Sequence, residues 1–270
     1  MRPRPPFFLI PLVIAAANWI GFQEVGAKET PVPDWVAKVP KPVAGSFPLP
    51  DSRPLRYTAG WAGVVAGKIS IDFSKEPDQQ TLHATGGTLG GARLLFPLDA
   101  DFTAHCDPVT LAPREATIIE NYRDEKRTTR QVFSPEKMTR KRSSEPANKD
   151  DGKTKIVHLP NVLDLQSSIL FLRSQPLKEG DQIEFLTYAT GSPYLAKVTV
   201  LPKEEVTVPA GTFSAHKLHL DLTGIDKKLA LKPYRRARNI TAWLSDDAER
   251  RFLRFSGDLL IGKVFVELDR

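Results

Sequence analysis

Hydrophobic and polar residues alternate along most of the chain after residue 54, as they do in β-strands that bury one face. Short breaks rich in turn-forming residues separate these runs, so neighbouring strands are expected to pair in antiparallel fashion. The sequence therefore predicts a mainly β protein built on an antiparallel sheet. The predicted strands cover residues 55–61, 67–73, 100–103, 115–122, 129–133, 182–188, 196–201, 217–222, 240–244 and 259–268.

One segment departs from this alternation and predicts a helix. Leu165, Ile169 and Leu172 have helical spacing, and Asp164 precedes them where its carboxylate can cap the first turn. We expect this helix, residues 164–173, to pack against the sheet.

Three other segments have compositions that indicate turns or irregular structure. Residues 28–54 contain seven prolines, which disfavour both helix and central strand and predict an extended strap or linker. Residues 143–155 are polar and predict a flexible hairpin tip, where function is not expected. The glycine-rich residues 85–96 lack the Gly-Lys-Ser/Thr of a phosphate-binding loop and predict a turn followed by a short helix.

The first 27 residues have the features of a secretory signal peptide. Arg2 and Arg4 precede an apolar run from Phe7 to Phe22, and small residues lead to an expected cleavage site after Ala27. The run is shorter than the roughly 20 residues that a membrane-spanning helix needs, so no integral membrane span is expected after cleavage. We therefore expect a periplasmic or secreted protein.

Charge and cysteine content say little about the partner or the function of the protein. The formal net charge is +6, with acidic and basic residues interspersed, so charge alone indicates no particular partner. Export makes a nucleic acid partner unexpected. Cys106 is the sole cysteine, which excludes an intramolecular disulfide, and we expect it to be a buried apolar residue.

Known catalytic and metal-binding patterns are missing from the sequence. The five histidines include no His-Glu-x-x-His pattern, and His216 and His219, three apart on a predicted strand, should point to opposite faces. Ser214 does not sit in a Gly-x-Ser-x-Gly elbow, and paired aspartates fit turns. We expect a protein that is not an enzyme and uses no metal or cofactor.

Polar residues inside apolar segments are the more informative feature. Asp101, Arg114, Asp164 and Arg173 are expected to form a buried or half-buried salt-bridged network that either docks the helix on the sheet or lines a cavity. Basic runs occur at residues 123–130, 140–142 and 232–238. Each is either a solvated surface or a contact for an anionic glycan, a phospholipid head group or a protein partner.

Several short motifs occur in a characteristic order and spacing. They are Tyr57-Thr58-Ala59-Gly60-Trp61-Ala62-Gly63, Leu111-Ala112-Pro113-Arg114, Leu163-Asp164-Leu165-Gln166-Ser167-Ser168, Val208-Pro209-Ala210-Gly211-Thr212-Phe213 and Ala242-Trp243-Leu244-Ser245-Asp246-Asp247. In these motifs the chain resembles the bacterial family called domain of unknown function 3108 (DUF3108). The resemblance implies an exported protein with an antiparallel curled sheet, a half-barrel or open barrel with one packed helix. It implies no reaction, cofactor or catalytic residue.

Three regions are predicted: a signal peptide at 1–27, a proline-rich strap or linker at 28–54, and a single β-rich domain at 55–270. We expect a non-catalytic periplasmic binding or carrier module for an amphipathic lipid or anionic glycan. The alternative is a scaffold that holds an envelope protein through a sheet edge or the strap, and an enzyme acting on envelope polymers is least favoured. The candidate ligand-binding residues are Trp61, Arg114, Arg173, Tyr234, Arg235, Arg236 and Trp243.

Overall fold

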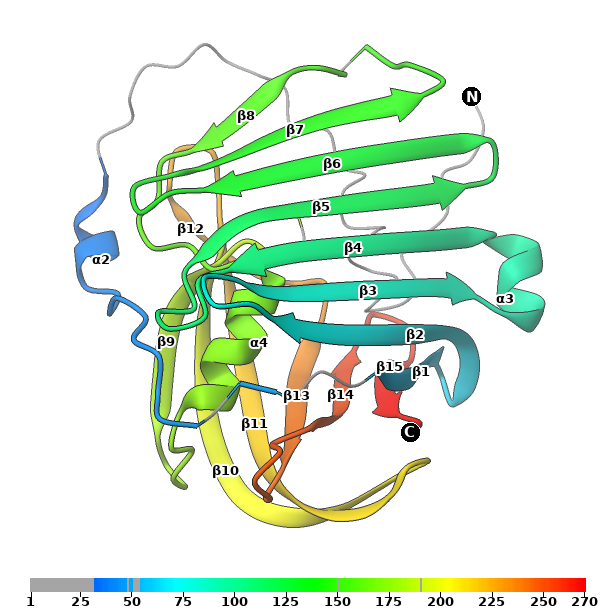
Figure 1. The fold of residues 1–270 in the computed structure, drawn as a ribbon, viewed down its shortest axis with the longest axis vertical. Helices are drawn as coiled ribbons and strands as arrows, with labels where there is room; N and C mark the ends of the chain where they lie inside the picture. Colours follow the sequence, from blue (N-terminus) through cyan, green and yellow to red (C-terminus); the bar gives the residue numbers. More distant parts are fainter. Residues whose placement is uncertain (1–31, 48, 51–53, 150, 190) are drawn as a thin grey trace.

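One antiparallel sheet of 15 strands forms the body of the protein (Figure 1). The computed structural model describes residues 32–47, 49–50, 54–149, 151–189 and 191–270, so the predicted signal peptide lies outside the described residues. The strands are β1 (Leu55–Trp61), β2 (Val64–Lys75), β3 (Gln80–Thr88), β4 (Leu98–Cys106), β5 (Pro113–Tyr122), β6 (Glu125–Phe133), β7 (Met138–Glu145), β8 (Thr154–Val157), β9 (Gln182–Thr187), β10 (Tyr194–Val208), β11 (Gly211–Ile225), β12 (Leu231–Pro233), β13 (Arg238–Ser245), β14 (Phe252–Asp258) and β15 (Lys263–Leu268). The helices are α2 (Asp34–Ala37), α3 (Gly90–Leu95) and α4 (Leu165–Ser174).

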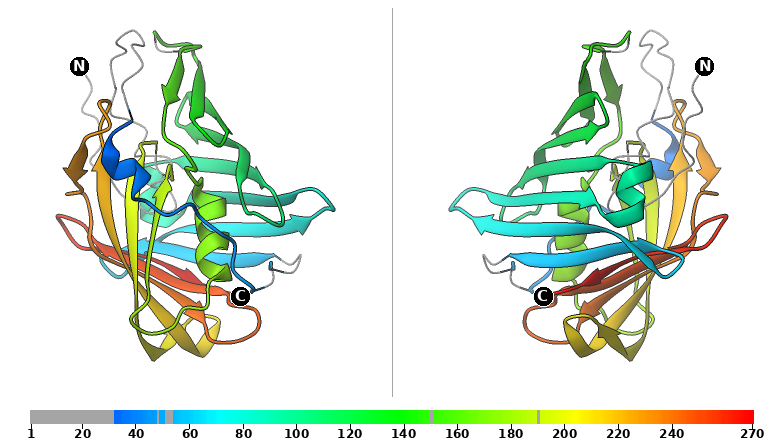
Figure 2. Two further views of the ribbon diagram at one scale, coloured as in Figure 1. Left: turned by 90° about the vertical axis from the view of Figure 1, so that its left-hand side faces the viewer. Right: turned by 90° about the vertical axis from the view of Figure 1, so that its right-hand side faces the viewer.

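The sheet folds back on itself without closing. Its strand order is β8-β7-β6-β5-β4-β3-β2-β1-β15-β14-β13-β11-β10-β9, with β12 paired to β11, so β8 and β9 are its two ends. We call β2–β8 the first arm and β9–β13 the second arm. The arms face one another, joined by β1, β15 and β14 (Figure 2). The prediction of a curled, open antiparallel sheet is confirmed.

Helix α4 lies between the two arms, as the sequence predicts (Figure 2). The Asp164 carboxylate caps it by accepting a hydrogen bond from the Ser167 backbone N–H at 2.7 Å. Leu170 and Phe171 are buried, and the Phe171 ring meets Phe185 of β9 edge-on at 5.4 Å. The hydrophobic core therefore surrounds the helix, where alternate residues of both arms converge.

The proline-rich strap follows the expectation with one exception. Its residues 34–37 form the single helical turn α2, which begins after Pro33 and ends before Pro40, whereas a wholly extended segment was expected. Proline is tolerated at the start of a helix, which explains the difference. The backbone N–H of Gly45 donates to the Ser174 hydroxyl at 2.9 Å, and the Trp35 indole donates to the Leu229 carbonyl at 3.0 Å. The strap is thus fastened to both α4 and the second arm.

Two predictions about strands need correction in their bounds. The hairpin predicted at residues 143–155 is present, because β7 and β8 pair in antiparallel fashion, but 143–145 belong to β7 and 154–155 to β8. Residues 259–268 hold a turn at 259–262 and only then strand β15. Pairing with neighbouring strands, which local composition does not report, extends β7 and β8 into the polar segment.

Candidate functional site

The inner face of the first arm is apolar beside α4 and cationic further along its strands. Phe133, Met138 and Val157 form a buried apolar row across β6, β7 and β8. Two residues along, Arg140 of β7 lies opposite Lys155 of β8, with both side chains half-buried. Strand alternation therefore places positive charge directly beside the core.

More cations continue along the same face. Arg142 lies two residues beyond Arg140, and Arg127 of β6 is buried and ion-paired with Glu125 at 2.6 Å. Glu120 of β5 lies opposite Arg127 and is also buried. We define the cationic cluster as Arg127, Arg140, Arg142 and Lys155 of the first arm together with Lys227, which approaches from the second arm.

Burial and mutual repulsion shift the pKa values of side chains in the cluster. Burial and the charges of nearby cations, Arg140 first among them, together lower the pKa of Arg142 to about 10. Burial and the charge of Arg140 also lower the pKa of Lys155 to about 8. Burial raises the pKa of Glu120 to about 7, although neighbouring arginines oppose that rise. An anion placed here would relieve the repulsion between the cations.

Tyr188 links the cluster to the second arm. Its hydroxyl donates to the Gly191 carbonyl at 2.6 Å, while the Arg140 guanidinium donates to the Tyr188 hydroxyl at 3.4 Å and to the Gly191 carbonyl at 3.3 Å. The Lys155 ammonium lies 5.8 Å from the centre of the Tyr188 ring. The two edges of the open sheet therefore meet at a cationic junction.

The cluster has the chemistry of an anion site. Arginine guanidinium groups recognise carboxylate and phosphate oxygens through paired N–H donors, and lysine adds a point charge. The described carboxylates near it are Glu120, Glu125 and, at its edge, Asp151.

The cluster was missed in the list of candidate residues, although two basic runs contain most of it. Residues 125–130 of the first run lie on β6 and residues 140–142 lie on β7, where alternation turns every second side chain inward. Arg140 and Arg142 are half-buried, while Lys141 between them is exposed. Applying the two-residue period to the basic runs would have separated inward from outward cations.

Of the seven candidate residues, Tyr234 is linked to the junction through Tyr194. The Tyr234 ring meets Tyr194 edge-on at 5.5 Å, and Tyr194 pairs in the sheet with Thr187, next to Tyr188. Burial raises the pKa of Tyr234 to about 12. Its two neighbours in the loop, Arg235 and Arg236, are exposed.

Trp61, Arg114 and Trp243 are separate from the cluster. The Trp61 indole donates to the Ile261 carbonyl at 2.7 Å at a turn of the sheet. Arg114 is exposed and paired with Asp107 at 3.3 Å. Trp243 is buried and donates to the Glu204 carboxylate at 2.7 Å. The structure therefore does not assemble these residues into one ligand site.

The predicted four-residue salt-bridged network is wrong. Asp101 alternates with the inward Phe102 on β4, so it points outward and pairs with His83 at 2.8 Å. Arg114 is likewise on the surface. Asp164 and Arg173 alone are buried, and they lie at opposite ends of α4.

Arg173 fastens the C-terminal end of α4 to the turn between β13 and β14. Its guanidinium donates to the Glu249 carbonyl from Nη2 at 2.6 Å and from Nε at 3.1 Å. We expect Arg173→Ala to lower the melting temperature by roughly 4–8 °C, since losing about 2 kcal/mol has that effect in a domain of this size. Thermal melts beside the exposed control Arg114→Ala test this, and unchanged melting with loss of a bound ligand would instead make Arg173 a ligand contact.

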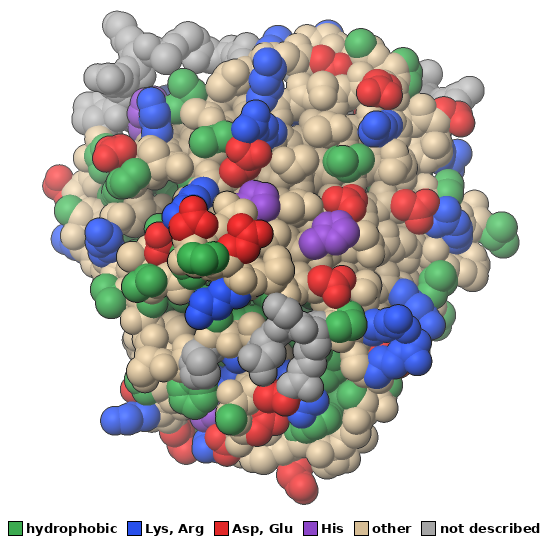
Figure 3. Space-filling model, in the orientation of Figure 1, with side chains coloured by type: hydrophobic (Ala, Val, Ile, Leu, Met, Phe, Trp, Pro, Cys, Tyr) green, Lys and Arg blue, Asp and Glu red, His purple; other side chains and the backbone are tan. Residues whose placement is uncertain are grey.

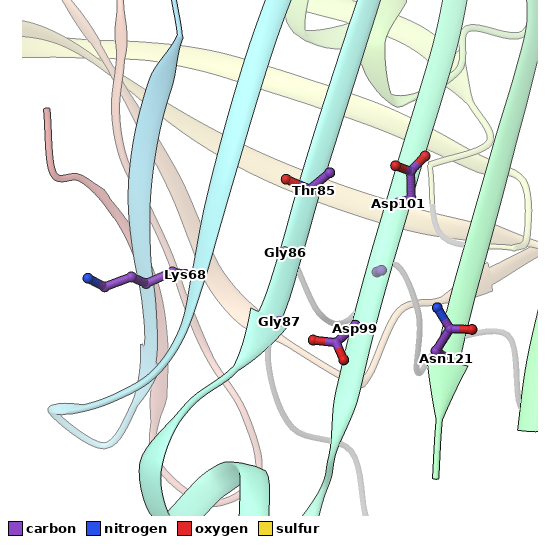
Figure 4. Close-up of a pocket in the computed structure, with 8 residues that line it drawn as sticks. Lys68, Thr85, Gly86, Gly87, Asp99, Asp101 and Asn121 are labelled. Carbon is purple, nitrogen blue, oxygen red and sulfur yellow. The ribbon is translucent and has the colours of Figure 1, made fainter. Parts of the chain in front are cut away.

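The outer face of the first arm carries a shallow depression of about 440 Å³ (Figure 4). The paired glycines Gly86 and Gly87 leave it open, because a Cβ on Gly87 would lie 2.5 Å from the Asp99 carboxylate. Acidic side chains and histidines gather on this face (Figure 3). Within the described residues, no group of three or more His, Cys, Asp or Glu side chains is arranged to hold a metal ion. The depression is polar and exposed and offers no place for an apolar ligand.

Fold and site together define an open, barrel-like β protein with a cationic inner face. A family model described as "Protein of unknown function (DUF3108)" matches residues 56–269, and the chain belongs to this family. No curated protein matches the chain. No helix in the described part is long and apolar enough to cross a membrane.

Solved structures with a similar fold have little sequence in common with this chain. A β-barrel-like protein of domain of unknown function DUF1849 from Brucella abortus has a TM-score of 0.53 at 11% identity, over 82% of this chain and 96% of that one. A candidate exported protein with a YmcC-like fold from Bacteroides fragilis has a TM-score of 0.35 at 9% identity, over 84% and 98%. A candidate lipoprotein from Parabacteroides distasonis has a TM-score of 0.34 at 11% identity, over 84% and 98%. The first of these similarities supports the barrel-like fold.

Proposed function

We propose that the protein is a non-catalytic, exported binding module whose cationic cluster holds the anionic group of an amphipathic lipid or glycan. The observation that carries the proposal is the group of inward cations between the two arms of an open sheet. The apolar row of Phe133, Met138 and Val157 lies next to it on the same face. A ligand with a charged group and an apolar part matches both sections.

Arg140→Gln with Arg142→Gln is the variant that tests this function. Glutamine keeps a hydrogen-bonding side chain but removes the charge, so we expect the occupancy of a co-purifying anionic molecule to fall at least tenfold, roughly 1.4 kcal/mol or more. Native mass spectrometry with lipid and glycan extraction, on protein purified from its own cell envelope, measures the occupancy. Lys141→Ala is the matched control, since Lys141 lies between the two arginines but points outward.

Two outcomes would reject the proposal. One is wild-type protein that carries no lipid or glycan. The other is equal loss of the ligand in the control and in the double variant, which would make the effect one of overall charge rather than of the inner face.

The alternative, a scaffold that binds an envelope protein, has less support. Edge strand β8 spans only Thr154–Val157 and carries Lys155, and short charged edges are poor templates for pairing. The described part of the strap is already bonded to α4 and to Leu229. Crosslinking in cells tests this alternative, and capture of a distinct envelope protein through β8 or the strap would favour it.

A further inference from the structure

Three connections at one end of the sheet lie side by side. Trp61, the last residue of β1, pairs with Val64 of β2 and Val264 of β15, which brings the β1–β2 and β14–β15 turns together. Gly67 of β2 pairs with Thr88, the last residue of β3, so α3 follows at the same end. The right-hand view of Figure 2 faces this end, with α3 in front.

These connections expose an unusual amount of apolar surface. Seven of the 13 large hydrophobic side chains that are exposed among the described residues lie in these connections or in the first two residues of β2, so the apolar exposure is concentrated rather than scattered. We call the seven the apolar end patch. With their exposed fractions, they are Val64 (67%), Val65 (50%), Leu89 (38%), Leu94 (87%), Leu95 (64%), Leu260 (96%) and Ile261 (66%).

Cations and an indole flank the apolar end patch. The Arg123 guanidinium donates to the Leu95 carbonyl at 3.2 Å and has no carboxylate partner among the described residues. Arg93 of α3 is half-exposed and paired with Asp99. The Trp61 indole N–H is already bonded to the Ile261 carbonyl, and Gly262 beneath it has no side chain to push the ring away. Apolar tips with a tryptophan and basic neighbours are typical of surfaces that enter the interfacial layer of a membrane.

We propose that the apolar end patch docks the protein on an anionic lipid bilayer, with Leu94 and Leu260 inserting first. These two side chains project from separate connections and are the most exposed, whereas a pairing of two folded chains needs a continuous complementary face. The charge of Arg123 complements acidic head groups. This surface is separate from the cationic cluster, so the protein can hold a ligand and rest on a membrane at the same time.

Vesicle sedimentation tests the proposal with wild type and the double variant Leu94→Glu with Leu260→Glu. We expect wild-type protein to sediment with vesicles of phosphatidylethanolamine and phosphatidylglycerol and more weakly with pure phosphatidylcholine. The double variant should bind the anionic vesicles at least tenfold more weakly. Because both leucines are exposed, the fold should tolerate the change, and circular dichroism checks that it does.

Val109→Glu is the matched control, because Val109 is 78% exposed in the connection between β4 and β5, at the other end of the strands. It should bind vesicles like wild type. The proposal would be overturned if wild-type protein bound neither kind of vesicle or bound both equally. It would also be overturned if Val109→Glu lost as much vesicle binding as the double variant. A further result would overturn it: wild-type protein that binds no vesicles but forms a dimer in analytical ultracentrifugation, with the dimer lost in the double variant. In that case a second copy of the chain would occupy the patch.

Discussion

Arg250→Ala should destabilise the protein by about 3 kcal/mol or more, one of the largest effects expected of any single substitution here. Arg250 is 3% exposed, and its guanidinium donates to three backbone carbonyls at and just after the end of α4, those of Arg173, Gln175 and Pro176. It also lies 3.4 Å from the centre of the Phe47 ring in the strap. Alanine would leave these carbonyls without donors and release helix, strap and turn from one another. Urea unfolding monitored by tryptophan fluorescence measures the change.

Arg251→Ala is the control for that experiment. Arg251 is the next residue, and its ion pairs with Asp247 at 3.3 Å and Glu249 at 3.0 Å lie near the surface. Such pairs contribute about 1 kcal/mol or less. Arg250→Lys should behave much like the alanine variant, because one ammonium cannot replace the guanidinium fork at three carbonyls. Equal stability of the Arg250→Ala and Arg251→Ala proteins would show that the carbonyls find other donors.

Strand periodicity predicted many of the strands that bury one face, although it missed β3 and β14. It identified the regular strand β5, whereas helical spacing and a capping carboxylate predicted α4 and its Asp164 cap. It failed where both faces have polar residues, as in β7 and β8, because their pairing depends on neighbours distant in sequence. The resemblance to DUF3108 supplied the curl of the sheet, which no local pattern encodes.

The site was harder to predict than the fold. Arg173 was correctly singled out as a polar residue in an apolar segment, but the partner that the structure describes is the Glu249 carbonyl, 76 residues away. Asp101 was grouped with it although it precedes Phe102, whose side chain belongs to the core. The cationic junction where Arg140 contacts Tyr188 exists only because the two arms fold towards each other. Residue spacing within one strand does not reveal such a contact.

Asp164→Asn should make the protein more stable at pH 8, by up to roughly 3 kcal/mol. Asp164 is 1% exposed, one carboxylate oxygen caps α4, and the other makes no hydrogen bond with the described residues. Burial raises its pKa from 3.8 to about 6, and each pKa unit corresponds to about 1.4 kcal/mol. The folded protein therefore binds the proton more tightly than the unfolded chain, so stability falls as pH rises through this window. Asparagine caps a helix equally well and carries no charge.

The pH dependence distinguishes this explanation from a general effect of the substitution. Chemical unfolding at pH 4, 6 and 8 should show the advantage of Asp164→Asn shrinking to below about 1 kcal/mol at pH 4, where the wild-type side chain is neutral in the fold and partly neutral in the unfolded chain. Asp107→Asn is the control with the opposite sign. The backbone N–H groups of Thr110 and Val109 lower the pKa of the Asp107 carboxylate, so that carboxylate stabilises the fold at neutral pH and the variant should be less stable there. A gain for Asp164→Asn that stays constant from pH 4 to pH 8 would mean that packing, and not the cost of burying a charge at the start of α4, sets the stability of this site.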